Sequence, residues 1–435
     1  MTGSRQPVYA LVDGNNFYVS CERLFDPRLE RRPVIVMSNN DGMVISRSQE
    51  VKALGIGMGA PMHHIKDAIR KHRIATLSSN YALYGDLSQR MMAVIGQFAA
   101  HQEIYSIDES FLDLTDLGGR DRVRHAQALR QRVGRWVGVP TCVGIAQTKT
   151  LAKLANRVAK KREAFEGVCD FTGMGRLELV SLLGGFAATD VWGVGRQWGA
   201  KLATLGIRTA RDLLLADPRT IRAQFGVVME RTVSELRGIP CQPLEAVVPD
   251  KKQILSSRSF GRATGDVEAL AESVTMHVTT AAEKLRRQGS ACATLQVFLR
   301  TNPFKPELPQ YHPSATVSLG APTDDSLRMV GAAVRAVREL HRPGYQYHKT
   351  GVILVDLQPK GVEQLDLFDD APALTSAGTT ARVRLMSAID RLNVKQGRGT
   401  LRFASEGIGY RWRMRREKVS PAYTTSWREL PLARA

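Results

Sequence analysis

Short apolar runs separated by polar turns predict a sheet in the first 175 residues. Residues 8–12 form one such run and end at Asp13, which predicts a buried strand with a carboxylate at its carboxyl end. Residues 32–38 and 44–46 flank the segment NNDG, a strong signal for a hairpin. Residues 103–115 and 140–146 are two further strand-like segments.

Helical spacing of apolar residues appears between these runs. It predicts helices at 49–54, 88–100, 122–137 and 148–161. The alternation of such helices with strands indicates an α+β sheet domain with an insertion at about 19–84.

The pattern changes near residue 174. From there to about 240 it is helical throughout, with repeated glycines, and 241–256 is polar like a linker. Residues 257–357 alternate strand-like runs with helices at 266–287 and 326–340, which predicts a small α/β domain. Beyond 358 the chain is polar and glycine-rich, with a short apolar helix near 381–392.

The composition points to a polyanionic partner. The chain has 435 residues, enough for about three domains, and its formal net charge is +19. Such an excess favours nucleic acid over an acidic membrane surface. We find no signal peptide and no run able to span a bilayer, and the five cysteines are widely spaced. We therefore expect a cytoplasmic protein with reduced thiols and no membrane association.

Three acids are candidates for metal chemistry. Asp13 ends a strand, and the adjacent Asp108 and Glu109 lie within an apolar segment, where unpaired carboxylates are costly. Two Mg²⁺ ions would compensate their charge and could activate an attacking hydroxyl. Asp108 and Glu109 reach one site only if the chain turns at 107–109, because neighbours on a strand point to opposite faces. An exposed turn is the alternative.

The helix at 148–161 is strongly amphipathic. One face is apolar, and another carries four cations: Lys149, Lys153, Arg157 and Lys160. This row either contacts DNA phosphates, for which Lys153 and Arg157 are our candidates, or is a solvated face.

A glycine turn marks the helical region. Gly193-Val194-Gly195 precedes a helix that ends at 205–207, and this resembles a helix-hairpin-helix motif. Backbone N–H groups at Gly193 and Gly195 would then bind a DNA phosphate without reading sequence. An ordinary αα-hairpin is the alternative.

Together these segments resemble the Y-family of translesion DNA polymerases over nearly the whole chain. Within it they are most similar to the UmuC type, the catalytic subunits of DNA polymerase V, and to MucB- and RumB-type relatives. The segments that carry the resemblance are VDGNNFY (12–18), SNNDGMVISRSQEVKALGI (38–56), YSIDESFLDLT (105–115), VGIAQTKTLAKLAN (143–156) and QLDLFDD (364–370).

The resemblance implies the roles of the acids. Asp13 and Asp108 would hold two Mg²⁺ ions. Glu109 would bind the catalytic ion that activates the primer 3′-hydroxyl for attack on a dNTP.

It also implies a nucleotide site built from five residues: Phe17, Tyr18, Ser46, Lys52 and Lys160. Tyr18 would be the steric gate that excludes a ribose 2′-hydroxyl. Many relatives have Tyr and Arg where this chain has Gln49 and Lys52, and Lys lacks the bidentate fork of Arg.

The implied architecture is a right-hand polymerase of the α+β class, with low fidelity and no proofreading nuclease. The expected domains are a palm (1–18 and 85–173), fingers (19–84), a thumb with the helix-hairpin-helix (174–240), a little finger (250–358) and a C-terminal extension (359–435).

Two segments of the extension imply partners. Gln364, Leu365, Leu367 and Phe368 resemble the peptide that docks on the bacterial sliding clamp; a strand-like linker is the alternative. Residues 395–418 carry a net charge of +6. In the UmuC type this tail implies contacts with a UmuD′-like dimer and a RecA filament, whereas a nonspecific DNA-binding tail is the alternative.

We therefore expect an error-prone polymerase that extends primer-template DNA with dNTPs in SOS-type damage tolerance. A stand-alone polymerase IV-like enzyme is the nearest alternative. Another two-metal enzyme such as a nuclease would need no steric gate, and a non-catalytic DNA-binding scaffold would be expected to lack one of the three acids.

Overall fold

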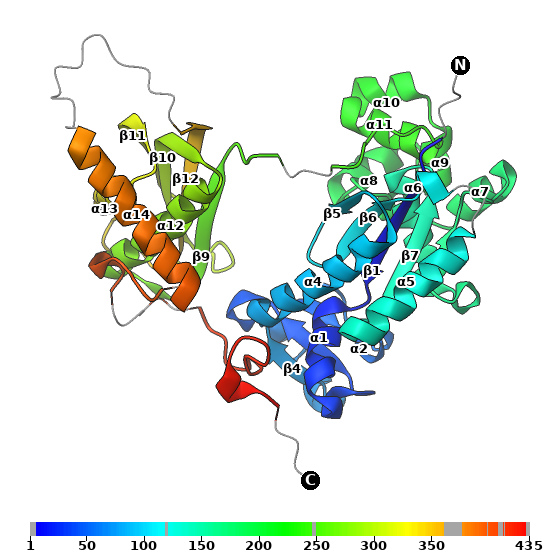
Figure 1. Cartoon of the computed structure of the whole chain (residues 1–435), viewed down its shortest axis with the longest axis horizontal. Coiled ribbons are helices and arrows are strands. Elements are labelled where there is room, and N and C mark those ends of the chain that lie inside the picture. Colours follow the sequence, from blue (N-terminus) through cyan, green and yellow to red (C-terminus); the bar gives the residue numbers. More distant parts are fainter. Residues whose placement is uncertain are drawn as a thin grey trace. The chain divides into compact units, whose positions relative to one another are not determined.

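The computed structural model divides the chain into two compact units (Figure 1). One comprises Met1–Ser38, Gly42–Val248 and Lys418–Ala435, and the other Asn39–Asp41 and Pro249–Glu417. The structure describes residues 6–117, 121–245, 249–360, 376–397, 399–407, 412 and 414–431.

The first unit is built around a five-stranded sheet of order β5-β6-β1-β7-β8. Its strands are β1 (Tyr9–Gly14), β5 (Gln102–Ile104), β6 (Glu109–Asp113), β7 (Thr141–Ala146) and β8 (Val168–Asp170). The central strand β1 pairs antiparallel with β6 and β7, and β7 pairs parallel with β8. The predicted buried strand that ends at Asp13 is therefore confirmed.

The two faces of this sheet follow the alternation of side chains along β1. Ala10 and Val12 pack with the helices α4 (Tyr81–Ile95) and α5 (Arg122–Val137). Leu11 faces the opposite side and packs in the core that includes α6 (Lys149–Lys161). Because side chains alternate in a strand, a run of apolar residues supplies both cores.

A second sheet of three strands, in the order β3-β2-β4, lies in the same unit. Its strands are β2 (Val34–Met37), β3 (Val44–Arg47) and β4 (Ala75–Ser78), with short helices α2 (Gln49–Ala53) and α3 (Lys66–Lys71). β2 and β3 are antiparallel, so the predicted hairpin is confirmed. Strand β4 pairs only with β2 among the named strands and is an edge of this sheet.

A layer of short helices follows the five-stranded sheet, as the pattern after residue 174 predicts. It consists of α7 (Arg176–Leu183), α8 (Arg196–Thr204), α9 (Ala210–Leu215), α10 (Pro218–Phe225) and α11 (Val227–Leu236). Their apolar residues share one core with α6. The carboxylate of Glu235 accepts from the backbone N–H of Thr150 at 3.0 Å, which ties α11 to the start of α6.

The second unit is a four-stranded antiparallel sheet of order β11-β10-β12-β9, packed with α12 (Val267–Arg287) and α13 (Ser326–Leu340). The strands are β9 (Ile254–Thr264), β10 (Ser290–Thr301), β11 (Ser314–Thr323) and β12 (Tyr347–Pro359). The helix α14 (Ser376–Gln396) also belongs to this unit.

Several predicted boundaries were wrong. Helix α4 begins at Tyr81 and not at 88, because Asn80 caps it by accepting from the backbone N–H of Leu83 at 3.3 Å. Strand β9 begins at Ile254, inside the expected linker, and α14 is longer than the predicted 381–392. The last residues of the expected extension, from Lys418 onward, belong to the first unit.

In the described part of the chain, no helix combines the length and the apolar character that crossing a bilayer requires.

Candidate active site

The backbone brings the three predicted acids together at one end of the central sheet. Asp13 on β1 is the direct partner of Glu109 on the neighbouring strand β6. The backbone N–H of Gly14 donates to the carbonyl of Asp108 at 2.8 Å. Residues 96 positions apart in sequence are therefore fixed as neighbours by the register of two strands.

The chain bends just before Glu109, as predicted. The backbone N–H groups of Tyr105 and Ser106 both donate to the carbonyl of Glu109 at 3.1 Å, which closes the turn between β5 and β6. The Ser106 hydroxyl lies 2.7 Å from Asp108 Oδ1 and accepts from the backbone N–H of Glu109 at 3.0 Å. Ser106 thus orients the Asp108 carboxylate and holds the backbone of Glu109.

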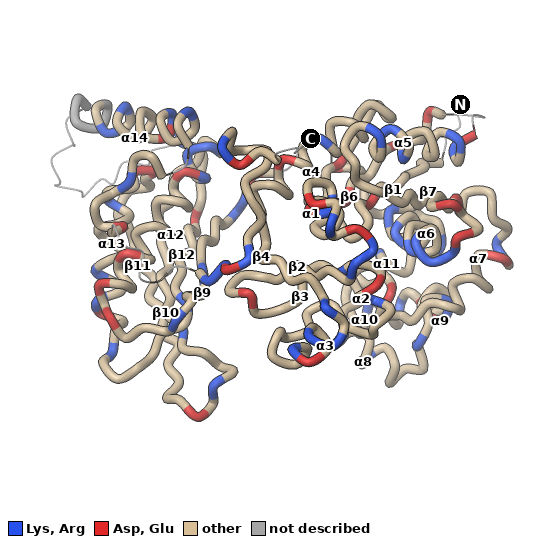
Figure 2. The backbone as a smooth tube through the Cα atoms, turned by 90° about the horizontal axis from the view of Figure 1, so that it is seen from below, with Lys and Arg blue, Asp and Glu red and all other residues tan. Residues whose placement is uncertain are grey.

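Two lysines of α6 pair with this group of acids. Lys160 Nζ lies 2.6 Å from Asp13 Oδ1, and Lys153 Nζ lies 2.9 Å from Glu109 Oε2. Figure 2 shows the basic positions gathered along α6. Burial raises the pKa of Asp13 to about 6, with Glu109 and Asp108 acting in the same direction and Lys160 against it.

Lys153 is held by aromatic rings as well as by Glu109. Its ammonium lies 4.4 Å from the ring centroid of Tyr105 and 5.3 Å from that of Trp192. Trp192 Nε1 donates to the Tyr105 hydroxyl at 3.1 Å. The sequence analysis missed Trp192, which lies 39 residues after Lys153 and has no spacing signal that links the two.

The other two cations of the α6 row also have acidic partners. Lys149 is buried and pairs with Glu103, and Arg157 lies 2.6 Å from Asp190. All four cations of the row therefore have acidic partners, while the side chains of Arg157 and Lys160 also stay partly exposed. Contact of Lys153 and Arg157 with DNA phosphates stays a prediction.

The helix α1 (Phe17–Phe25) begins three residues after Gly14 and presents the predicted nucleotide-contacting aromatics. Phe17 is buried, and Tyr18 is half-buried against Tyr84 of α4, with ring centroids 4.4 Å apart and planes at 15°. Desolvation raises the pKa of Tyr18 to about 12, so its phenol is neutral at pH 7. The sequence analysis missed Tyr84.

The other predicted nucleotide contacts come from the three-stranded sheet. Ser46 lies on β3, buried, and its hydroxyl is 3.5 Å from the carbonyl of Asn16. Lys52 lies on α2, which begins after the cap residue Ser48. Desolvation lowers the pKa of Lys52, and the nearby cations Arg47 and Lys160 lower it further. Lys52 and Lys160 therefore belong to different elements whose charges interact, and Arg47 is a further cation that was not predicted from the sequence.

The donor chemistry of the acids fits a hard divalent cation. Carboxylate oxygens are the ligands that Mg²⁺ takes in proteins, and mutual repulsion between the acids would be relieved by positive charge. Within the described residues, however, no three acidic, histidine or cysteine side chains converge on one point as a closed metal site would require. Lys160 and Lys153 supply the positive charge in this structure.

The predicted glycine turn lies before α8. Gly193 has φ +85°, a conformation that favours glycine, and Gly195 is the residue before the first helical position. Both are exposed. The element before the turn is one short 3₁₀ segment (Ala188–Asp190), so the motif lacks a full first helix directly before its turn.

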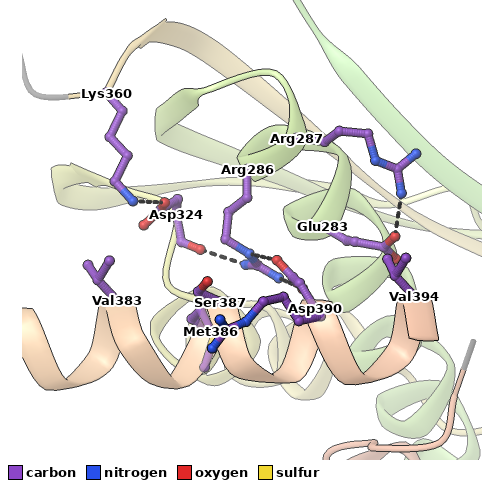
Figure 3. Close-up of a pocket in the computed structure, with 11 residues that line it drawn as sticks. Glu283, Arg286, Arg287, Asp324, Lys360, Val383, Met386, Ser387, Asp390 and Val394 are labelled. Atoms are coloured by element: carbon purple, nitrogen blue, oxygen red, sulfur yellow. Dashed lines mark hydrogen bonds and ion pairs between the residues drawn. The ribbon is translucent and has the colours of Figure 1, made fainter. Parts of the chain in front are cut away.

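A separate pocket lies in the second unit, between α12 and α14 (Figure 3). Arg286 of α12 lies 2.6 Å from Asp390 of α14, and Lys360 lies 2.6 Å from Asp324. Arg286 also donates to the carbonyl of Asp324 at 2.8 Å. These charged side chains pair with one another. We therefore infer that the residues around the pocket hold α14 against the rest of the second unit.

The predicted clamp-binding residues Gln364, Leu365, Leu367 and Phe368 lie outside the described residues. That prediction therefore has no structural counterpart here.

Solved structures with this arrangement of sheets and helices define the class of fold. A Y-family DNA polymerase chimera of Dbh and Dpo4 covers 81% of this chain and 99% of its own length, with a TM-score of 0.63 and 19% identity. An insertion ternary complex of Dbh DNA polymerase covers 81% and 99% at a TM-score of 0.52 and 20% identity. The fold is that of the Y-family DNA polymerases.

Sequence comparison then places the chain more closely. The impB/mucB/samB family model matches residues 12–157, and its C-terminal domain matches 251–367. Protein UmuC of Salmonella typhimurium (strain LT2) is 45% identical over 97% of this chain and 99% of its own length. Protein ImpB of Salmonella typhimurium is 43% identical over 98% and 100%. The chain belongs to the impB/mucB/samB family and is a UmuC-like Y-family DNA polymerase.

Two further matches bear on its parts. DNA polymerase IV of Oceanobacillus iheyensis is 25% identical over 89% of this chain and 88% of its own length, a more distant likeness than that to UmuC. Residues 383–433 match a domain of unknown function, DUF4113. This last match spans most of α14 and the residues from Lys418 that belong to the first unit.

Proposed function

We propose that this chain performs error-prone, template-directed nucleotidyl transfer from a dNTP to a primer 3′-hydroxyl, using two Mg²⁺ ions. The observation that carries the proposal is the register of β1 and β6, which makes Asp13 and Glu109 direct partners with Asp108 beside them. Three acids at one end of the sheet, with Lys160 2.6 Å from Asp13, match the needs of phosphoryl chemistry.

Separate groups of residues would bind the metal ions and the nucleotide. Asp13 and Asp108 would hold the two ions, and Glu109 would hold the one that faces the primer terminus. When bound, the ions would lower the pKa of the attacking hydroxyl and stabilise the leaving oxygen. Lys160 and Lys52 would bind the triphosphate, with Ser46 beside them. Phe17 and Tyr18 would bound the sugar pocket.

We place the palm at 1–18 and 85–173, the fingers at 19–84, the thumb at 174–240, the little finger at 250–358 and the extension at 359–435. Backbone N–H groups at Gly193 and Gly195 would contact a DNA phosphate, supported by their exposure before α8. The chain would act in the cytoplasm, in SOS mutagenesis. Its partners would be a sliding clamp, a UmuD′-like dimer and a RecA filament.

Primer extension opposite an abasic site tests the activity. Wild type is compared with Asp108→Ala/Glu109→Ala and with Asp116→Ala, an exposed acid of the same region that should be neutral. Each is assayed with Mg²⁺ and dNTPs, with and without clamp, UmuD′-like dimer and RecA–ATP filament. We expect bypass by wild type and by Asp116→Ala, and none by the double variant.

The additions separate the alternatives. Bypass that needs the UmuD′-like dimer and RecA supports the UmuC-type role, whereas bypass by the chain alone indicates polymerase IV-like behaviour. Retained bypass by the double variant would reject the assignment of the acids. DNA binding without synthesis in any mixture would reject the proposed activity and favour a scaffold.

A further inference from the structure

A segment near the end of the chain packs against α1, the helix that carries Tyr18. Residues 418–423, which we call the strap, lie within the first unit against β4, α4 and α1. The strap lies in the part of the chain that matches the domain of unknown function. It makes three kinds of contact with that unit.

The first contact extends the three-stranded sheet. Val419 forms a parallel bridge with Ser78 on the edge strand β4. The backbone N–H of Ser78 donates to the carbonyl of Lys418 at 2.9 Å, and the N–H of Lys418 donates back to the Ser78 hydroxyl at 3.0 Å. Lys418 Nζ reaches the Thr76 hydroxyl at 2.6 Å. An edge strand offers such unpaired backbone groups, so one backbone–backbone bond and two bonds to side-chain hydroxyls hold the strap on β4.

The second contact links Ser420, which is partly buried, to buried polar groups. Asn80, the cap of α4, donates to the Ser420 hydroxyl at 3.0 Å and to its carbonyl at 3.2 Å. The Ser420 hydroxyl donates to Glu22 Oε1 of α1 at 3.1 Å. The Tyr84 hydroxyl donates to the same oxygen at 2.6 Å. Glu22 is 2% exposed, so the loss of a donor there leaves a buried carboxylate poorly satisfied.

This chain of groups leads to the proposed sugar pocket. Tyr84, which Glu22 fixes, is fully buried and stacks on Tyr18 at 4.4 Å. The third contact acts at the other end of the same helix. Tyr423 stacks on Phe25, the last residue of α1, with ring centroids 4.8 Å apart and planes at 7°. The strap therefore holds both Glu22 and the end of the helix whose second residue is Tyr18.

We propose that the strap positions Tyr18, so that discrimination between deoxyribose and ribose depends on the C-terminal end of the chain. Ser420 and Tyr423 are the positioning residues, and they act through Glu22, Tyr84 and Phe25 without touching nucleotide. The inference rests on the proposed role of Tyr18 as the residue beside the sugar. It assigns a task to residues 418–423 of the segment that matches DUF4113.

The test compares sugar selectivity in full-length proteins. Single-nucleotide insertion opposite an undamaged template base gives kcat/KM for a dNTP and for the matching rNTP, and their ratio is the selectivity. The variants are Ser420→Ala, Tyr423→Ala, Ser420→Thr and a chain that ends at Glu417. Trp427→Ala is the matched control, because that ring is 91% exposed and lies just beyond the strap.

We expect the ratio to fall about three- to tenfold in Ser420→Ala and Tyr423→Ala, the range of one lost hydrogen bond or ring contact. The shortened chain should fall further, whereas Ser420→Thr keeps the hydroxyl and should stay near wild type. A merely structural role would lower kcat/KM for both sugars equally and leave the ratio unchanged. An unchanged ratio in all strap variants overturns the inference.

Tyr18→Ala separates this inference from the proposed function. If Tyr18→Ala loses selectivity while the strap variants keep it, only the strap inference fails; if Tyr18→Ala also keeps it, the role of Tyr18 fails. Amide hydrogen exchange across residues 17–25 tests the link between the strap and α1, and it does not require nucleotide insertion. We expect faster exchange there in the chain that ends at Glu417 and in Ser420→Ala, and equal exchange would contradict the link.

Discussion

The ammonium of Lys160 pairs with Asp13 and stays accessible to a second anion. Its ammonium lies 2.6 Å from Asp13 Oδ1, and a third of the side chain is exposed at the same time. An ammonium in this position can pair with the carboxylate or with a triphosphate that lies beside it. Charge-assisted hydrogen bonds of this kind are stronger than neutral ones.

We predict that Lys160→Ala raises KM for the incoming dNTP about tenfold or more, because one charge-assisted contact contributes roughly 1.5–3 kcal/mol. Lys160→Arg keeps the charge and should recover part of the loss. Steady-state single-nucleotide insertion measures both. Lys161→Ala is the matched control on the same helix, where the side chain is exposed. An unchanged KM in Lys160→Ala would exclude the contact.

His277 is a buried imidazole in the second unit. It is 1% exposed, and its Nδ1 lies 3.2 Å from the Ser256 hydroxyl. Desolvation lowers its pKa to about 3, and the cations Arg258 and Lys349 act in the same direction. The folded chain therefore keeps His277 neutral at pH values where an unfolded chain binds a proton.

Protonation of His277 in the unfolded chain makes the stability of the second unit depend on pH. Below pH 6.5 the unfolded state takes up a proton that the folded state refuses, so the stability of this unit falls as pH decreases toward 3. The contribution is about 1.4 kcal/mol per pH unit. Denaturant unfolding between pH 7.5 and 4.5 measures it. We predict a smaller slope in His277→Gln, with the exposed His312→Gln as control; identical slopes in all three would contradict the assignment.

At the scale of elements, the glycine turn before α8 offers two residues with different constraints. A methyl group at either position meets open space, with no atom closer than 4.0 Å. Only Gly193 has the positive φ of +85° that strains other residues, whereas Gly195 has φ −77°. Substitutions at the two positions therefore distinguish an effect on the stability of the turn from an effect on its exposed surface.

We predict that Gly193→Ala lowers the free energy of unfolding by about 1 kcal/mol, since an L-residue in this conformation is strained. Gly195→Ala should leave stability unchanged, but its methyl group would stand between the backbone N–H and a DNA phosphate and lower DNA affinity several-fold. Thermal unfolding and DNA titration of both variants measure this. Unchanged DNA affinity in Gly195→Ala would contradict phosphate binding at the turn.

Local patterns predicted much of the element structure. The amphipathic spacing gave the helices at Arg122–Val137 and Ser326–Leu340 at their observed bounds. Helix α4 was predicted seven residues short, because the signal lies in the Asn80 cap and in Tyr84, which packs against α1. Strand β9 was missed because polar residues such as Ser257 and Ser259 interrupt the apolar pattern, and only their pairing with β12 makes the segment a strand.

The acids of the site could be predicted, but their partners could not. Asp13 stands out at the end of an apolar run, and Asp108 and Glu109 stand out within one. That Lys153 pairs with Glu109 depends on how α6 packs beside β1 and β7, and that Trp192 covers Lys153 depends on the following helical layer. Tertiary contacts of this kind leave no periodic signal in a single sequence.

At the scale of the whole molecule, the formal charge of +19 predicts a strong dependence of DNA binding on salt. A protein that neutralises six or more phosphates loses roughly 10³-fold or more in affinity between 50 and 200 mM salt. We expect at least a tenfold loss over that range. Fluorescence anisotropy with primer-template DNA measures it. A flat salt profile would mean that the excess charge does not face DNA.

The chain leaves the first unit before Pro249 and belongs to it again from Lys418, so the segment from Pro249 to Glu417 is attached to the first unit at both of its ends. A segment closed at two points samples fewer arrangements than a pendant one of equal length, because closing a loop removes chain entropy. The second attachment therefore lowers the chain entropy of the segment from Pro249 to Glu417. A cut in the chain after Glu417 would restore that entropy, because it would leave the four-stranded sheet attached to the first unit at one end of this segment only.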